Sequence, residues 1–192
     1  MRSAALPRRT TKETDIEVKI NLDAYKECVV KTPHGFFSHM MESFSKHSRF
    51  AVEIDATGDN TGPHHMVEDV GIVLGESILE AAGDKSGIER FGSVSMPMDE
   101  TLVDVAIDFS GRGYLVFDAP EINDTETGLG LHLVNDFFYA MCFNGRFNLH
   151  IHVKCGTNPH HIIEAMFKGT AVALRRALQV TGKGIPSTKG VL

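Results

Sequence analysis

Two short histidine-rich runs with the same pattern are the first candidates for chemistry in this chain. Residues 64–69 have the sequence His-His-Met-Val-Glu-Asp, and residues 160–165 have the sequence His-His-Ile-Ile-Glu-Ala. The second run starts 96 positions after the first, half the length of the 192-residue chain. Apolar residues recur at helical spacing after both runs, so each run should begin a helix.

In each run a histidine and a glutamate lie four residues apart, which places them on the same face of a helix. The neighbouring histidine projects about 100° away, so one helix end can serve two sites. An imidazole and a carboxylate one turn apart commonly bind zinc, manganese or iron. A single copy would equally suit a helix N-terminus with a polar first turn, but the repeat favours metal binding. The predicted ligands are His64, His65, Glu68, His160, His161 and Glu164.

The composition excludes several classes of function. The net charge is −6 and the pI is near 5.9, so there is no basic field to attract nucleic acid or anionic lipid. The three cysteines lack a C-x-x-C spacing, which predicts free thiols in a reducing compartment. The sequence has neither a signal-peptide core nor an apolar run of about 20 residues. We therefore expect a soluble, cytoplasmic protein that binds neither nucleic acid nor membranes.

The hydrophobic pattern predicts the same order of elements in both halves of the chain. After a loose arm at 1–10, the first half should contain strands at 13–22, 28–30 and 49–55 and helices at 36–47 and 64–82. The second half should contain strands at 101–109, 114–117 and 146–153, a helix at 129–143 and a helix starting at 160. The predicted fold class is α+β, with two duplicated β-β-α-β-α halves, 1–92 and 93–192, and helices packed on one face of each sheet.

Superimposing the halves selects a further ligand. Residues 48–50 match residues 145–147 at an offset of 97, and the same offset places Asp136 opposite His39. If His39 binds metal, Asp136 should be its counterpart, with His132 one helical turn earlier as the alternative. Pseudo-two-fold symmetry then predicts two metal sites that mix the halves. One contains His39, His65, His160 and Glu164, and the other contains His64, Glu68, Asp136 and His161.

Four motifs make the chain resemble a known family. They are HHMVEDVGI at 64–72, PMDETL at 97–102, SGR at 110–112 and NPHHIIEA at 158–165. With them, residues 11–192 resemble the imidazoleglycerol-phosphate dehydratases, metal-dependent lyases of histidine biosynthesis. The resemblance implies conversion of D-erythro-imidazole glycerol phosphate to imidazole acetol phosphate and water, with two Mn²⁺ ions per active site. It also implies a large homo-oligomeric shell built from trimers, with active sites between subunits.

The same resemblance implies roles for individual residues. Glu13 corresponds to an N-terminal acid that acts in catalysis or contacts the substrate; from the sequence alone it would be a solvated acid at a strand start. The implied catalytic residues are Glu13, His65, Glu68 and Glu164. The implied substrate-binding residues, which chiefly hold the phosphate and include the C-terminal tail, are Glu13, His39, His47, Arg90, Arg112, Lys168, Ser187, Thr188 and Lys189.

The chain departs from the family pattern near the predicted ligands. Gly62 and Pro63 stand where two acids are usual, Ser38 replaces an acid or amide, and Asp136 stands where a histidine is frequent. Missing carboxylates would remove acceptors that orient metal-bound imidazoles and would weaken metal binding. Aspartate is itself a suitable ligand for manganese, so the second site should persist.

Two other classes of protein share some of these features. A di-metal phosphate-ester hydrolase would use similar ligands but would require a bridging water. A metal-binding shell protein without catalytic activity would keep the ligands but would not need Glu13 or the cationic phosphate clamp.

Overall fold

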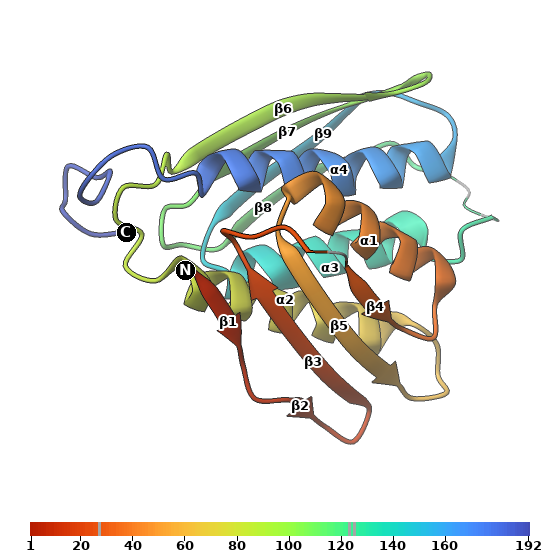
Figure 1. Cartoon of the computed structure of the whole chain (residues 1–192). Coiled ribbons are helices and arrows are strands. Elements are labelled where there is room, and N and C mark those ends of the chain that lie inside the picture. The colour runs from red at the N-terminus through yellow and green to blue at the C-terminus, as the bar shows by residue number, and fades with distance from the viewer. Residues whose placement is uncertain (27, 123, 125) are drawn as a thin grey trace.

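Two β-sheets enclose four long helices in the computed structural model, which describes residues 1–26, 28–122, 124 and 126–192 (Figure 1). The helices are α1 (Gly35–Ser48), α2 (His64–Ala82), α3 (Gly130–Asn144) and α4 (Pro159–Ala177). Both α2 and α4 pack against the inner face of a sheet, while α1 packs on α4 and α3 packs on α2. The expected α+β class, with helices on one face of each sheet, is confirmed.

The two sheets have the same topology. The first has the strand order β1-β3-β5-β4, and the second has the order β6-β7-β9-β8. In each sheet the last pair of this order is parallel and the other neighbouring strands are antiparallel. The strands are β1 (Ser3–Ala5), β2 (Arg9–Thr10), β3 (Thr14–Asn21), β4 (Val29–Lys31), β5 (Ala51–Gly58), β6 (Phe91–Met98), β7 (Thr101–Asp108), β8 (Tyr114–Asp118) and β9 (Asn148–Cys155).

The ten predicted strands and helices are all present, in the predicted order of two β-β-α-β-α halves. The expectation of a loose arm at 1–10 was wrong, because β1 and β2 both pair with β3. Strand β6 was not predicted, although Val94, Met96 and Met98 alternate along it and pack against the core. Gly92 and Pro97 weaken the strand pattern of this segment, and pairing with β7 along its whole length stabilises it. The division of the chain at residues 92 and 93 stays a prediction.

The core lies where the helices meet between the sheets. Phe37 of α1 packs edge-on against Phe137 of α3, with ring centroids 5.5 Å apart, and Phe137 stacks on Phe167 of α4 at 5.1 Å. Helix α2 lies unusually close to α3, because a Cβ on Gly75 would lie 2.3 Å from the carbonyl oxygen of Met141. Aromatic packing and this close approach fix the helices of one half against those of the other.

The two helices of each packed pair, α1 with α4 and α2 with α3, run parallel to each other. His39 lies near Glu164, and further along both helices Arg175 donates to the carbonyl of His47, so α1 and α4 run in the same direction. In α2, Gly71 faces Phe137 and Gly75 faces Met141 of α3. The N-termini of the four helices therefore gather at one end of the molecule (Figure 1). This arrangement brings the histidine-rich runs of the two halves to a common end.

No helix in the described part of the chain is long and apolar enough to cross a membrane.

Candidate metal centre and substrate site

One group of possible metal ligands joins the two halves at the start of α1 and α4. His39, His160 and Glu164 place one ligand atom each within 4.8 Å of one another. The Glu164 carboxylate lies 2.9 Å from His160 Nε2 and 3.6 Å from His39 Nε2. Asn158 caps α4 by accepting hydrogen bonds from the backbone amides of His160 and His161. This cap fixes the first turn of the helix, which carries the histidine pair.

Glu164 is ionised in this group although it is only 6% exposed. Burial acts to raise its pKa, but the ammonium of Lys168, 2.8 Å away, and the ring of His160 hold the pKa below its ordinary value. A buried carboxylate kept negative beside two imidazoles is suited to a divalent cation.

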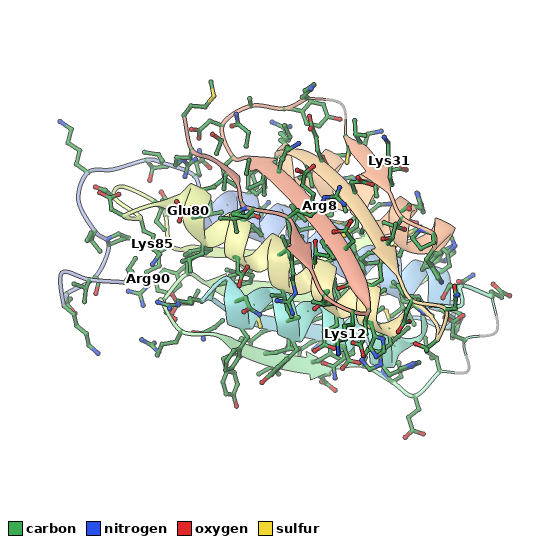
Figure 2. All side chains as sticks on the ribbon, turned by 90° about the horizontal axis from the view of Figure 1, so that it is seen from below. Arg8, Lys12, Lys31, Glu80, Lys85 and Arg90 are labelled. Atoms are coloured by element: carbon green, nitrogen blue, oxygen red, sulfur yellow. The ribbon has the colours of Figure 1, made fainter. Side chains whose placement is uncertain are left out.

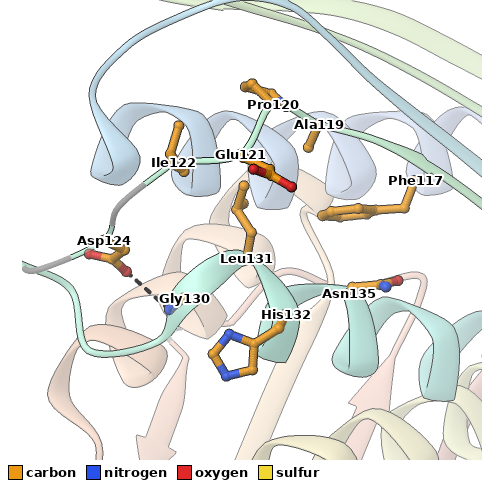
Figure 3. A pocket seen from close by; sticks show the side chains of 10 residues that line it. All are labelled: Phe117, Ala119, Pro120, Glu121, Ile122, Asp124, Gly130, Leu131, His132 and Asn135. Carbon is orange, nitrogen blue, oxygen red and sulfur yellow. Dashed lines mark hydrogen bonds between the residues drawn. The ribbon is translucent and has the colours of Figure 1, made fainter.

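The equivalent group in the other pair of helices contains Asp136. His64 Nε2 lies 3.6 Å from Glu68 and 3.5 Å from Asp136 of α3. The structure thus places Asp136 beside His64, as the superposition of the halves predicted. His132, the alternative, instead lines a cavity of about 570 Å³ with Leu131 and Asn135 (Figure 3).

The second histidine of each run faces a different carboxylate. His65 Nδ1 lies 3.0 Å from Asp59 and 3.9 Å from Glu13, and these three residues form a second group of possible ligands. His161 Nδ1 lies 2.7 Å from Glu100. Within the described part of one chain, His65 is therefore not grouped with His39, and His161 is not grouped with His64. The two predicted four-residue sites remain predictions, and each would need ligands from a second chain.

Hydrogen bonds to these carboxylates favour the protonated form of both imidazoles. The hydrogen bond to Asp59 raises the pKa of His65, and the hydrogen bond to Glu100 raises the pKa of His161. The pKa of Glu100 lies far below its ordinary value because His161 and the amides of Asn158 and Thr157 all donate to it. Each Nδ1–H that donates to a carboxylate leaves Nε2 as the free ligand atom and makes the ring more basic.

Sequence analysis did not predict the roles of Asp59 and Glu100. Asp59 lies outside the four motifs, and Glu100 was part of the motif at 97–102 without a role of its own. Both residues face a histidine only because a strand end and a helix start are adjacent in the fold. Asp59 also supplies an acceptor near His65 although Gly62 and Pro63 lack one.

Most of the predicted phosphate-binding residues lie at the opposite end of the molecule, but Lys168 lies 2.8 Å from Glu164, beside the metal ligands. The Arg90 amide donates to the carbonyl of Ala177, the last residue of α4, and its guanidinium pairs with Asp108 at 2.7 Å. Arg90 also donates to the carbonyl of Pro186, which ties it to the tail that carries Ser187, Thr188 and Lys189. Figure 2 shows Lys85 and Arg90 together, well away from Lys12, the neighbour of Glu13.

Arg112 lies at the tail end as well. The chain terminus passes against Gly111, where a Cβ would meet the carbonyl carbon of Leu192 at 2.5 Å. His47 lies elsewhere, on α1, and its pKa is lowered by burial and by the charge of Lys168. The predicted substrate contacts of one chain thus divide into two clusters. The tail cluster consists of Arg90, Arg112, Ser187, Thr188 and Lys189, and the helix cluster consists of His39, His47 and Lys168.

Because His65 and His161 have different carboxylate partners, the raised pKa of each histidine can be tested separately. Glu100→Gln should lower the pKa of His161 toward its ordinary value and leave the pKa of His65 unchanged, while Asp59→Asn should do the reverse. In metal-free protein the protonated form of each histidine is stabilised, so this contribution to stability is present at low pH and is lost as pH rises through the raised pKa. Imidazole titration by NMR measures both values. An equal fall for both histidines in one variant would contradict the assigned pairs.

Comparison with known proteins agrees with this geometry. The family model described as imidazoleglycerol-phosphate dehydratase matches residues 32–174. The chain is 50% identical to the imidazoleglycerol-phosphate dehydratase of Lacticaseibacillus casei and 49% identical to that of Methanococcoides burtonii, each over the whole of both chains.

Solved structures give the same result. The crystal structure of IGPD from Pyrococcus furiosus in complex with (S)-C348 superimposes with a TM-score of 0.85 at 40% identity, covering 97% of this chain and 100% of that one. The Staphylococcus aureus enzyme superimposes with a TM-score of 0.81 at 39% identity, covering 91% and 98%. The chain therefore belongs to the imidazoleglycerol-phosphate dehydratase family, the metal-dependent dehydratases of histidine biosynthesis.

Proposed function

We propose that this dehydratase binds two Mn²⁺ ions per active site and uses them to dehydrate D-erythro-imidazole glycerol phosphate. The observation that carries the proposal is the pair of equivalent ligand groups, His39 with His160 and Glu164, and His64 with Glu68 and Asp136. Each group combines imidazole with carboxylate, a donor set that suits manganese. His65 and His161 would complete the coordination through Nε2, since their Nδ1 atoms face carboxylates.

The reaction requires removal of a proton from carbon and loss of a hydroxyl group. A bound divalent ion supplies Lewis acidity, which stabilises negative charge on the imidazole of the substrate. Glu13 is 58% exposed and is proposed to take the side-chain proton. His65, Glu68 and Glu164 are the further proposed catalytic residues and would hold the metal. His39, His47 and Lys168 are proposed to contact the substrate.

The substrate phosphate is proposed to bind to Arg90, Arg112, Ser187, Thr188 and Lys189. Guanidinium groups bind phosphate oxygens through paired hydrogen bonds, and a lysine adds a mobile charge. Arg90 contacts Ala177 at the end of α4, whereas His160 begins the same helix. At 1.5 Å per residue these positions lie about 25 Å apart, farther than a small phosphorylated imidazole can span.

One chain therefore cannot supply both the metal end and the tail end of one site. We propose that the tail cluster of one chain closes over the metal groups of a neighbouring chain, in a large homo-oligomeric shell built from trimers. The cytoplasm is the proposed location, because the substrate is a charged phosphate of histidine biosynthesis and the three cysteines are free thiols.

Turnover tests the metal dependence directly. Manganese-loaded protein should convert imidazole glycerol phosphate to imidazole acetol phosphate, and a chelator should abolish this conversion, as measured by mass spectrometry. Restored activity on adding Mn²⁺ back separates metal loss from unfolding. Release of inorganic phosphate without formation of the ketone would favour the di-metal phosphate-ester hydrolase instead.

Asp136 provides a test specific to this chain. Asp136→Ala should lower occupancy of the second metal site, while Asp136→His should preserve or raise it, because imidazole is also a suitable ligand. His132→Ala is the matched control, one helical turn away and on the wall of the separate cavity. Elemental analysis of the purified proteins measures occupancy. Loss of one metal in His132→Ala but none in Asp136→Ala would reverse the assignment.

Complementation tests the shared site. His160→Ala should remove a metal ligand, and Lys189→Ala should remove a phosphate-binding residue of the tail. Each pure variant should therefore be nearly inactive. In mixed assemblies, isolated through two different affinity tags, sites with both ends intact should reach roughly a quarter of the total if two chains build each site. Mixed assemblies with no activity above either parent would show that a site does not combine these two ends from different chains.

A further inference from the structure

Glu13 and Glu100 occupy equivalent positions in the two halves but have different surroundings. Glu13 directly precedes β3 and Glu100 directly precedes β7. The strands correspond in register, because Asn21 at the end of β3 pairs with the first residue of β5, and Asp108 at the end of β7 pairs with the first residue of β9. Duplication therefore placed one acid at the same point of each half, beside the second histidine of each run.

The carboxylate of Glu100 accepts hydrogen bonds from four groups. Its carboxylate accepts from the Thr101 hydroxyl at 3.0 Å, from the amides of Thr157 and Asn158 at 3.1 and 2.9 Å, and from His161 Nδ1 at 2.7 Å. With these partners fixed, Glu100 anchors the turn before α4 and orients His161.

The groups equivalent to the partners of Glu100 are bound elsewhere in the first half. The Thr14 hydroxyl donates to Asp69, and Asp59 accepts from the amide and hydroxyl of Thr61 and from His65 Nδ1. Glu13 lies 3.9 Å from His65 Nδ1, beyond hydrogen-bond distance. Among the described residues, no hydrogen bond reaches its carboxylate.

Two sequence differences between the halves explain this contrast. Asp69 follows Glu68 in the first run, but Ala165 follows Glu164 in the second, which leaves the Thr101 hydroxyl for Glu100. Asp59 directly follows β5, but Gly156 directly follows β9. A Cβ on Gly156 would lie 2.5 Å from Thr101 Oγ1, so the second turn has no room for an acid there.

We propose that Asp59 and Asp69 are positioning residues that keep Glu13 free to reach the substrate. They satisfy His65 and Thr14, the two groups that would otherwise bind Glu13 as their counterparts bind Glu100. The duplicated acid is thus a structural anchor in one half and a free carboxylate in the other. This inference rests on the proposed role of Glu13 as the residue that takes the proton.

The first test converts the first half to the pattern of the second. Asp59→Gly combined with Asp69→Ala should let Glu13 bind His65 and Thr14, and kcat should fall at least about tenfold with little change in KM. A crystal structure of this variant should place the Glu13 carboxylate within about 3.2 Å of His65 Nδ1. A variant with wild-type kcat, or one in which Glu13 stays apart from both groups, would overturn the proposal.

A double-mutant cycle separates positioning from general damage. Glu13→Gln alone should lower kcat by about 10²–10⁴-fold, the range for loss of a general base. Adding Asp59→Gly and Asp69→Ala to Glu13→Gln should lower kcat by less than about twofold more, because the group they position is already absent. Multiplicative losses would mean that the two aspartates act independently of Glu13, which would overturn the proposal.

Single and conservative variants protect the test against misfolding. Asp59→Asn keeps an acceptor oxygen for Thr61 and still fills the space between His65 and Glu13, so it should retain more of the kcat than Asp59→Gly does. Asp15→Asn, which disrupts an exposed pair with Arg8 two residues from Glu13, is the matched control for loss of a nearby charge. Equal metal content and equal assembly size are required of every variant compared.

The outcomes also separate this inference from the proposed function. If Glu13→Gln keeps wild-type kcat, Glu13 is not the base, and both the proposed role and the inference built on it fall. If Glu13→Gln is inactive while the Asp59→Gly and Asp69→Ala variant is fully active, the role of Glu13 stands and only the positioning role is wrong.

Discussion

The parallel packing of helices across the two halves is the constraint on which the rest of the structure depends. Helix α1 of the first half packs on α4 of the second, and α2 of the first half packs on α3 of the second, so both of these closely packed pairs combine the two copies of the repeat. The packing of Phe37 against Phe137 and the contact of Gly75 with the α3 backbone also join the halves and permit few other arrangements, because close-packed interiors tolerate neither gaps nor overlap. All four helices consequently begin at one end, where their polar first turns meet.

This packing explains why a helix that carries two adjacent histidines can serve two different sites. Consecutive residues differ by about 100° around the helix axis. His160 turns toward Glu164 and the first residues of α1, while His161 turns toward the hairpin that carries Glu100. A carboxylate on Nδ1 fixes the ring and leaves Nε2 as the ligand atom.

The duplicated halves share their framework but differ where a single substrate must be handled. Their sheets have the same strand order, and their helices begin with the same histidine pair. The acids around these histidines differ, since Asp59 and Asp69 have Gly156 and Ala165 as counterparts. A dehydration that removes one proton from carbon requires only one base for that proton. Divergence of a few polar residues at strand and helix ends can separate a structural acid from a reactive one without changing the core.

Sequence alone determined the repeat, the fold class, the order of the main elements and the pairing of Asp136 with His64. These follow from local periodicity and from the overlay of two copies, which need no knowledge of distant contacts. The edge strands β1 and β2 were beyond sequence analysis, because pairing with a neighbour stabilises them rather than their own pattern. Strand β6 has an alternating pattern of Val94, Met96 and Met98 that Gly92 and Pro97 obscure. Only the tertiary structure decided that Asp59 and Glu100 orient His65 and His161, and that Arg90 lies at the far end of α4 from His160. Glu100 and Arg90 meet residues far apart in the chain through the packing of whole elements, and Asp59 meets His65 through the conformation of the turn between β5 and α2, so local periodicity reveals none of these relations.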